Sequence, residues 1–490
     1  MFKLKSLKNQ KISSTIVVQT LFYLFPLTFI LGNLVVSLHC VIFILASTYL
    51  IYQKKLNFRF NNQSWILVIF FLYFFFLTFV QFQYPGLIWD EIITELKNTY
   101  GGKGLLVDWW MSENGNPAIK TLLLFRFLFL FLVIDILFFN KVIDIKKFFL
   151  SSFICTSFVS LDILLQYITG SDIFNYKTEW KYNSGPFGDE KIANTYLKNF
   201  SFFSFFYLFQ LKENKNLKNL SFIFIIIIHL TAVLVAGSRM PMILFLFGCF
   251  FIFLMVKNLR FVMSVGVFLF LLISLQIAKT DTHIKNSYYK FFIDINIIKN
   301  FNNKSKFLTK EENKNLDKEH HLQKEASIDP VAKDILFLRN SGHYKVMNTA
   351  IVMWKEKPLT GFGFKAFRIK CLEILEENNR ERGDKAQKLA CGNHPHNYYF
   401  ELLSEAGLIG FFLILLFFLV ILKDSFNLLL KNNKRNTLEL TLSYPFIIIF
   451  LLEVWPLKST GSFFTSWGAT FFWLNIAILC AFINEKRIKN

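Results

Sequence analysis

The feature that most constrains this chain is a series of long apolar runs that alternate with short polar connections. A helix needs about 20 apolar residues to cross the hydrocarbon core of a bilayer, and a soluble domain does not carry many uninterrupted runs of that length. The chain has 490 residues, of which 54% are hydrophobic. We therefore predict an all-α polytopic membrane protein with about twelve transmembrane helices. The predicted spans lie near residues 15–31, 33–52, 64–82, 119–138, 147–169, 195–212, 217–236, 240–257, 259–278, 398–422, 438–457 and 463–483.

Basic residues gather in every second connection, for example Lys54 and Lys55 after the second run and Lys257 and Arg260 after the eighth. Cytoplasmic connections of membrane proteins are enriched in Lys and Arg, which predicts that both termini are cytoplasmic. The formal net charge of +20 follows this distribution. It therefore indicates contact with membrane lipid and not with nucleic acid.

The remaining connections then face outward, and the one over residues 279–397 is much the longest. It separates an N-terminal membrane region at 1–278, with about nine spans, from a C-terminal membrane region at 398–490, with about three. Between residues 335 and 367, apolar residues recur at helical spacing. This pattern predicts a helix that lies against the membrane face, and a small packed subdomain would give the same pattern.

A polar stretch, His394-Pro395-His396-Asn397, stands directly before the tenth apolar run. Pro395 favours an extended conformation at His394, so a helix should begin just after it. His396 would then lie at the start of that helix, where unpaired backbone N–H groups favour anions. If the run crosses a bilayer, His396 is a titratable group held at the membrane surface.

The cysteines divide into two groups. Cys371 and Cys391 lie in the long outward loop, whereas the other cysteines lie in apolar runs, where we interpret them as packing residues. If the protein lies in an inner bacterial membrane, the loop faces an oxidising compartment, and we predict a Cys371–Cys391 disulfide that fixes the segment before His394. Two unpaired thiols are the alternative. A metal site of Cys391, His394 and His396 would lack a fourth ligand at the usual spacing.

Four short motifs follow one another between residues 185 and 410. They are Gly185-Pro186-Phe187-Gly188-Asp189-Glu190, Gly237-Ser238-Arg239, Pro358-Leu359-Thr360-Gly361-Phe362-Gly363, and His396-Asn397 with the later Gly407 and Gly410. Together they resemble the O-antigen ligase and O-antigen polymerase superfamily of bacteria. The chain departs from that family at Ser341-Gly342-His343, where the family often has an Arg. Arg339 or Lys345 would then supply the charge.

The resemblance implies a GT-C-like glycosyltransferase that takes a glycan from undecaprenyl diphosphate on the periplasmic face and needs no cofactor. The implied acceptor is a second glycan or the lipid A core. The residues fit this chemistry, because a leaving diphosphate needs fixed cations and Arg239 stands at an outer helix start. The acceptor hydroxyl needs a base, for which His396 is the candidate. Direct displacement would invert the anomeric centre.

Other candidate residues have more than one interpretation. Arg126, inside the fourth run, should face the protein interior, where it either binds diphosphate or pairs with a carboxylate. Asp189 and Glu190 would bind sugar hydroxyls or serve as an alternative base. His394 and Asn397 are expected to contact the acceptor or the sugar.

The chemistry is predicted to be metal-independent. A metal-dependent transferase of lipid-linked sugars usually places a carboxylate in its first outward loop, and that loop is here little more than Gly32-Asn33. Adjacent acids such as Asp189 and Glu190 do not make a convincing cation site.

Three activities are weighed against one another. A ligase moves a finished glycan onto the lipid A core, whereas a polymerase joins one lipid-linked chain to another. The segment from Gly185 to Glu190 slightly favours the polymerase. A flippase would need polar groups near the middle of the membrane and, usually, internal repeats, and the sequence has no convincing repeat.

Overall fold

The computed structural model describes residues 13–58, 60–81, 117–178, 182–211, 214–294, 343–382, 389–431, 438–459 and 461–489. Within these ranges the regular structure is helical, and the one extended pairing is an isolated antiparallel bridge between Ser171 and Lys177. The predicted all-α fold is confirmed for this part of the chain.

Eight helical segments in the described ranges are long and apolar enough to cross a membrane. They contain α2 (Asn33–Lys54), α3 (Asn62–Gln81), α7 (Phe125–Phe139), α8 (Ile145–Thr169), α10 (Lys215–Val235), α12 (Arg260–Thr280), α17 (Tyr398–Lys431) and α19 (Ser466–Lys489). A polytopic membrane fold is therefore confirmed.

The four other predicted spans are also helices, but their crossing of the membrane stays a prediction. They are α1 (Ser14–Thr28), α9 (Ala193–Gln210), α11 (Arg239–Met255) and α18 (Leu438–Glu453). Three of them, α1, α11 and α18, have only 15, 17 and 16 residues. The fourth, α9, carries buried polar side chains, among them Lys198.

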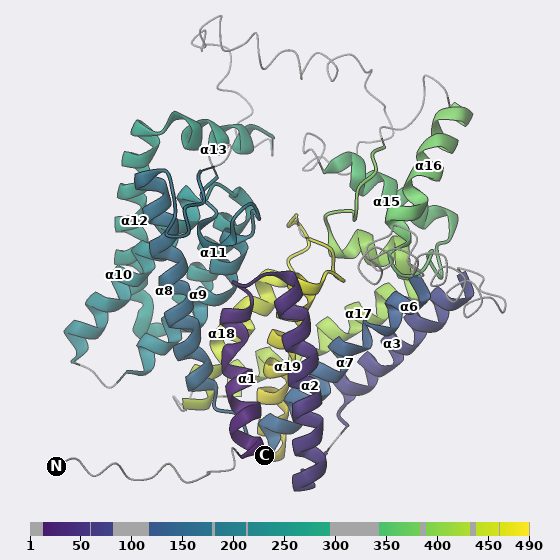
Figure 1. Ribbon diagram of the computed structural model, residues 1–490, viewed down its shortest axis with the longest axis horizontal. Helices are drawn as coiled ribbons and strands as arrows, with labels where there is room; N and C mark the ends of the chain where they lie inside the picture. The colour runs from purple at the N-terminus through teal and green to yellow at the C-terminus, as the bar shows by residue number, and fades with distance from the viewer. Residues whose placement is uncertain are drawn as a thin grey trace, which may run out of the picture.

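The helix α19 forms the centre of the bundle, where it packs against α7, α18 and α2 (Figure 1). In its apolar stretch 89% of the residues are buried, against 22% for α12. Phenylalanine rings fill the space between helices: the ring of Phe203 lies 5.1 Å from that of Phe148 and 4.9 Å from that of Phe446. Close packing of this kind holds membrane helices together, because lipid supplies no hydrophobic driving force between them.

Three helices stand at one end of the bundle, at the top of Figure 1, and the C-terminus lies at the opposite end. They are α13 (Thr282–Asp294), α15 (Tyr344–Glu356) and α16 (Ala366–Arg382). Because the charge pattern predicts cytoplasmic termini, we refer to the end that carries α15 and α16 as the outer end.

The helix predicted between residues 335 and 367 is shorter in the structure. It ends at Glu356, and Lys357 leaves the helical conformation because it precedes Pro358. After a turn, α16 begins and packs on α15, so the pair has a small hydrophobic core of its own. The buried residues of this core are Val346, Ala350, Met353, Phe362, Ala366, Phe367, Cys371 and Ile374.

Candidate functional site

Asn397 caps the N-terminus of α17, which begins at Tyr398 as predicted. Its Oδ1 atom accepts hydrogen bonds from the backbone N–H groups of Tyr399, at 2.9 Å, and Phe400, at 3.4 Å. Its Nδ2 atom donates to the carbonyl oxygens of Pro456, at 2.8 Å, and Lys458, at 3.3 Å. One buried amide therefore both starts the helix and ties it to the loop after α18. In the structure Asn397 holds the backbone of the site, where the sequence predicts a contact with substrate.

Three histidine rings pack together beside this cap, tilted against one another. The ring centroid of His396 lies 4.2 Å from that of His343 and 4.3 Å from that of His394. His396 has a φ of 58°, a left-handed conformation that few residues other than glycine adopt. Burial lowers the pKa of His343, which favours its neutral form. The structure thus brings His394 and His396 together and adds His343, which the sequence marks only as a departure from the family.

The segment that carries these rings is fastened on both sides. A disulfide joins Cys371 of α16 to Cys391, the pair that the sequence predicts, with 5.5 Å between the Cα atoms. The hydroxyl of Thr349 in α15 donates to the carbonyl oxygen of Ala390 at 2.8 Å and accepts from its N–H at 3.1 Å. The pair of helices α15 and α16 on one side and α17 on the other therefore fix the orientation of His396.

Below the histidines, α17 is broken at Gly407, which has a φ of 63° and a ψ of −169°. The segment from Pro358 to Gly363 fills the break. The N–H groups of Leu408 and Ile409 donate to the carbonyl oxygens of Pro358 and Leu359, at 2.9 and 3.2 Å. In return, the carbonyl oxygens of Ser404 and Glu405 accept from Phe362 and Gly363, at 3.0 and 2.8 Å. Irregular backbone is tolerated at membrane depth only where such partners satisfy it.

Two motif glycines have a steric reason to be glycine. A Cβ atom on Gly407 would lie 2.3 Å from the carbonyl oxygen of Leu359, and one on Gly361 would lie 2.6 Å from the backbone nitrogen of Gly407. Both glycines also have a positive φ. The Pro-x-x-Gly-x-Gly segment and the later glycine thus form one crossing of two backbones.

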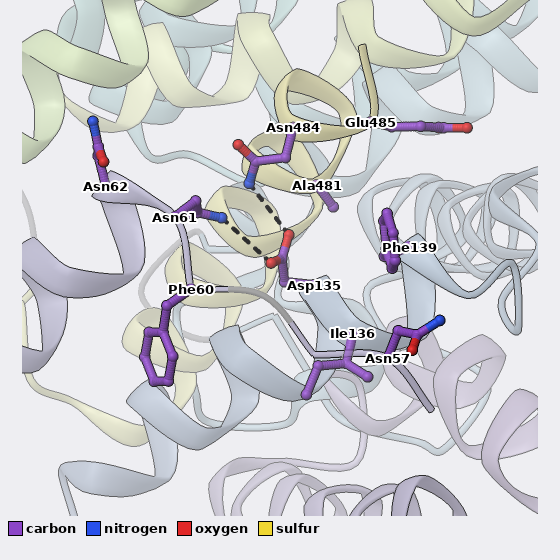
Figure 2. A pocket seen from close by; sticks show the side chains of 10 residues that line it. All are labelled: Asn57, Phe60, Asn61, Asn62, Asp135, Ile136, Phe139, Ala481, Asn484 and Glu485. Carbon is purple, nitrogen blue, oxygen red and sulfur yellow. Dashed lines mark hydrogen bonds between the residues drawn. The ribbon is translucent and has the colours of Figure 1, made fainter. Parts of the chain in front are cut away.

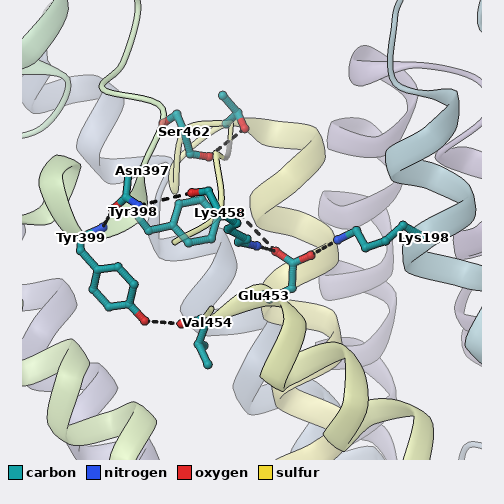
Figure 3. A network of polar contacts seen from close by, with 9 residues as sticks. Lys198, Asn397, Tyr398, Tyr399, Glu453, Val454, Lys458 and Ser462 are labelled. Carbon is teal, nitrogen blue, oxygen red and sulfur yellow. Dashed lines mark hydrogen bonds and ion pairs between the residues drawn. The ribbon is translucent and has the colours of Figure 1, made fainter. Parts of the chain in front are cut away.

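A buried ionic network lies beside the capped helix start (Figure 3). Glu453, at the end of α18, pairs with Lys198 of α9 and, at 2.7 Å, with Lys458. The hydroxyl of Tyr398 donates to the same carboxylate at 3.4 Å, and the Lys458 ammonium lies 4.9 Å from the Tyr398 ring. Burial lowers the pKa of Lys458 to about 8. The negative charge of Glu453 opposes this shift, and the positive charge of Lys198 adds to it.

This network was not among the predicted site residues. The sequence does carry a signal for it, because Lys198 lies inside one predicted span and Glu453 lies near the end of another. Charged residues inside membrane spans are rare and usually pair with one another. Because Asn397 bonds the carbonyl of Lys458, the network supports the backbone on which His396 stands.

Arg239 is the first residue of α11, as predicted, and follows Gly237, whose φ is 91°. Among the described residues it makes no hydrogen bond or ion pair, so its half-buried guanidinium has no fixed counter-ion. Nearby, burial raises the pKa of Tyr288 in α13, and the charge of Arg239 opposes that shift. In Figure 1, α11 lies in the left half of the view and α15 in the right half.

The other predicted anion and sugar ligands are dispersed. Lys345 is exposed in the first turn of α15, two residues after His343. Asp189 and Glu190 are exposed in the connection between a short 3-10 helix, η1 (Gly185–Phe187), and α9. Arg339 lies outside the described residues.

Arg126 lies at the start of α7, where its Nη2 atom donates to the hydroxyl of Ser466 at 2.9 Å. Its Nε atom is buried without a hydrogen bond. Among the described residues no carboxylate pairs with it. Of the two predicted interpretations, pairing with an acid therefore finds no support in this part of the chain.

A cavity of about 200 Å³ lies at the other end of the bundle (Figure 2). Asp135 points into it and accepts from the side-chain amides of Asn61, at 3.4 Å, and Asn484, at 3.3 Å. These residues lie near the start of α3 and the ends of α7 and α19, away from the histidines. The cavity is therefore separate from the candidate site.

The fold and the site define a class: a polytopic, all-α membrane protein with three grouped histidine rings at the outer end of its helices. Within that class, residues 222–415 match the family model of O-antigen ligase. The match runs from α10 into α17 and includes Arg239, His343 and His396. It confirms the resemblance to the O-antigen ligase and polymerase superfamily that the motifs indicate. A search of curated proteins found no match.

Proposed function

We propose that the protein is a membrane glycosyltransferase that transfers or polymerises glycan repeat units from undecaprenyl diphosphate on the periplasmic face. The observation that carries the proposal is the group of three histidine rings at the capped start of α17. An imidazole is the side chain best suited to take a proton near neutral pH. Here it stands at the outer end of a membrane helix, within the stretch that matches the family.

In the proposed reaction, His396 accepts the proton of an acceptor sugar hydroxyl while the hydroxyl oxygen attacks the anomeric carbon of the donor. The bond between that carbon and the diphosphate oxygen breaks, and the diphosphate leaves with the electron pair. Attack from the opposite face inverts the anomeric centre. No metal enters this scheme, since fixed cations neutralise the charge that develops on the leaving group.

The donor diphosphate is assigned to Arg239 and Lys345. Arg239 lacks a counter-ion among the described residues and stands at a helix N-terminus, where backbone N–H groups add to its field. Lys345 is exposed and two residues from His343.

The neighbouring groups act by positioning. The rings of His343 and His394 hold the ring of His396 between them, and the Asn397 cap fixes the backbone. Asp189 and Glu190 are proposed to contact sugar hydroxyls, since both are exposed near the start of α9.

The test is His396→Ala expressed in a strain that lacks the chromosomal gene, with protein level checked in membranes. We expect glycan assembly on lipopolysaccharide gels to fall by about 10²- to 10⁴-fold, as for loss of a general base. His283→Ala, in α13 at the same end of the molecule, is the matched control and should retain assembly. Full assembly in His396→Ala would overturn the proposal.

The gels also separate the ligase from the polymerase. Loss of a polymerase leaves a single repeat on the lipid A core, whereas loss of a ligase leaves a bare core and accumulating lipid-linked glycan. The segment from Gly185 to Glu190 leads us to propose the polymerase first. A flippase is not favoured, because the match is to a ligase family.

A further inference from the structure

Four basic side chains come together beside the break in α17, and only one of them, Arg126, was singled out from the sequence. The others are Lys120 of α6 (Pro117–Leu122), Lys365 in the turn before α16, and Arg368 in the first turn of α16. We call these four residues the basic cluster. Burial lowers the pKa of Lys365 to about 8, and the charges of Arg368, Lys120 and Arg126 add to this shift. The four charges therefore repel one another across a partly buried space.

The backbone holds the cluster in place. The N–H of Lys365 donates to Oε2 of Glu405 at 2.9 Å, and the N–H of Phe364 donates to Thr78 of α3 at 2.9 Å. The Phe364 ring lies 5.4 Å from that of Phe464, in the loop that leads to Ser466, the partner of Arg126. Phe364, the neighbour of Lys365, and Arg126 thus contact residues two positions apart, Phe464 and Ser466.

Lys365 also has a strained backbone, with a φ of 56°. A side chain other than glycine reaches this conformation only at the expense of about 1 kcal/mol. The conformation turns the chain sharply between the segment that fills the break in α17 and the start of α16. The ammonium group of Lys365 lies 5.1 Å from the centroid of the Phe364 ring, which is a cation–π contact.

The nearby acids do not neutralise the cluster. Oε2 and Oε1 of Glu405 accept the backbone N–H groups of Lys365 and Phe367, at 2.9 and 3.3 Å. Glu401 accepts from the hydroxyl of Ser462 and the N–H of Phe463. None of the four cations forms an ion pair with a described residue. Even with both carboxylates ionised, four positive charges against two negative ones leave an excess of two.

An excess of fixed, unpaired cations at the outer end is a site for a compact anion with more than one negative charge. Arg126 offers a buried Nε donor that no described group uses, and Arg368 is exposed, so an anion can enter from the surface. Guanidinium groups bind phosphate oxygens through paired hydrogen bonds. In Figure 1 the cluster's helices α6 and α16 lie at the right of the view, whereas α11 with Arg239 lies at the left.

We propose that the basic cluster binds the phosphate or diphosphate group of the acceptor lipid, as a second anion site distinct from the donor site at Arg239. This inference rests on the proposed function, in which the acceptor is itself carried on a phosphate-bearing lipid. Two separate cradles let both lipid-linked substrates bind at once. They also keep the acceptor from occupying the donor site.

Protection from acylation tests the site without any knowledge of the sugar. The purified full chain in detergent is treated with acetic anhydride, and the acetylation of Lys365 is followed by peptide mass spectrometry with and without inorganic pyrophosphate. Saturating pyrophosphate should slow the acetylation of Lys365 by about tenfold. Lys370, a partly exposed lysine on α16 that pairs with Glu373, is the internal control and should not change. Unchanged acetylation of Lys365 would overturn the site.

Variants and lipids then identify the ligand. Arg368→Gln, an exposed change that should not disturb folding, and Arg126→Gln should each abolish the protection, whereas Arg239→Gln should leave it intact. Loss of protection in Arg239→Gln alone would show that the anion binds at the donor site and would overturn the proposal.

Protection by undecaprenyl diphosphate that persists in Arg239→Gln indicates a lipid-linked acceptor, and protection by lipid A indicates the core as acceptor. Equal protection by vesicles of phosphatidylglycerol would show a site for any lipid headgroup and would also overturn it. If glycan assembly is normal in the deletion strain, the proposed function fails. If pyrophosphate does not protect Lys365, the second site alone fails.

Discussion

The imidazole of His343 packs against that of His396, with 4.2 Å between ring centroids and the rings tilted by 43°. The two residues lie on different elements, one directly before α15 and one directly before α17. Burial lowers the pKa of His343 and so favours its neutral state. The contact suggests that His343 orients the proposed base instead of contributing charge.

A substitution series at His343 separates these two roles. His343→Ala removes the stacked ring and should lower glycan assembly by about tenfold to a hundredfold, the effect expected when a reacting group loses its orientation. His343→Phe keeps a flat ring without charge and should retain clearly more activity than His343→Ala. The measurement is the ladder intensity on lipopolysaccharide gels at matched protein level. Equal loss in Phe and Ala variants, with activity kept in His343→Arg, would show that charge is what matters.

The same burial makes stability depend on pH. Because the pKa of His343 is lowered in the folded protein from its ordinary value of 6.5, the unfolded chain binds more protons there. The stabilisation is present above pH 6.5 and is lost as the pH falls through that value toward the lowered folded pKa. The Tm in detergent should therefore drop between pH 7 and pH 5. His343→Phe should show a shallower drop, and identical slopes in both proteins would refute the assignment.

Gly407→Ala tests the crossing of the two backbones. The added Cβ atom would lie 2.3 Å from the carbonyl oxygen of Leu359, in a left-handed conformation, and nothing soft can move away. We expect a loss of about 2–4 kcal/mol of stability, seen as a lower Tm in detergent. Gly461→Ala is the matched control, because a Cβ there meets nothing within 4 Å. A normal Tm for Gly407→Ala would mean that the break in α17 is not as described.

Local parts of this arrangement could be predicted from the sequence. The start of α17 followed from Pro395, because a proline acts on its immediate neighbours. The end of α15 near Pro358 obeys the same local rule, although the predicted helix ran past it. The apolar runs gave the spans for the same reason, since burial in lipid acts on each helix separately.

The contacts that build the site could not be predicted in that way. Lys198 and Glu453 are separated by 255 positions, and no periodicity reports which span meets which. The contact of His343 with His396 likewise depends on how α15 packs over α17. The basic cluster around Lys365 likewise depends on how the segment before α16 packs into the break in α17 at Gly407.

Glu453→Gln probes the buried network. It removes the charge that Lys198 and Lys458 share, so two buried ammonium groups lose their counter-ion. Breaking a buried ion pair on one side costs about 3–5 kcal/mol, which predicts a strongly lowered Tm. Glu373→Gln, in the exposed pair with Lys370, should cost less than about 1 kcal/mol. The double variant Lys458→Met/Glu453→Gln should recover part of the loss, and an equal or greater loss would argue against shared charge.

The disulfide between Cys371 and Cys391 offers the last test, because it encloses four trypsin sites, at Arg380, Arg382, Lys385 and Lys388. Trypsin applied to the purified protein should leave fragments that stay joined on a non-reducing gel and separate after reduction. Replacement of both cysteines by serine should lower stability by about 2–4 kcal/mol and should also reduce glycan assembly, because the histidine segment is then held at one side only. Cys249→Ser, at a buried unpaired cysteine, controls for the loss of a thiol. Fragments that separate without reduction would show that the two cysteines are not bonded, and full activity in the double variant would show that the bond does not position His396.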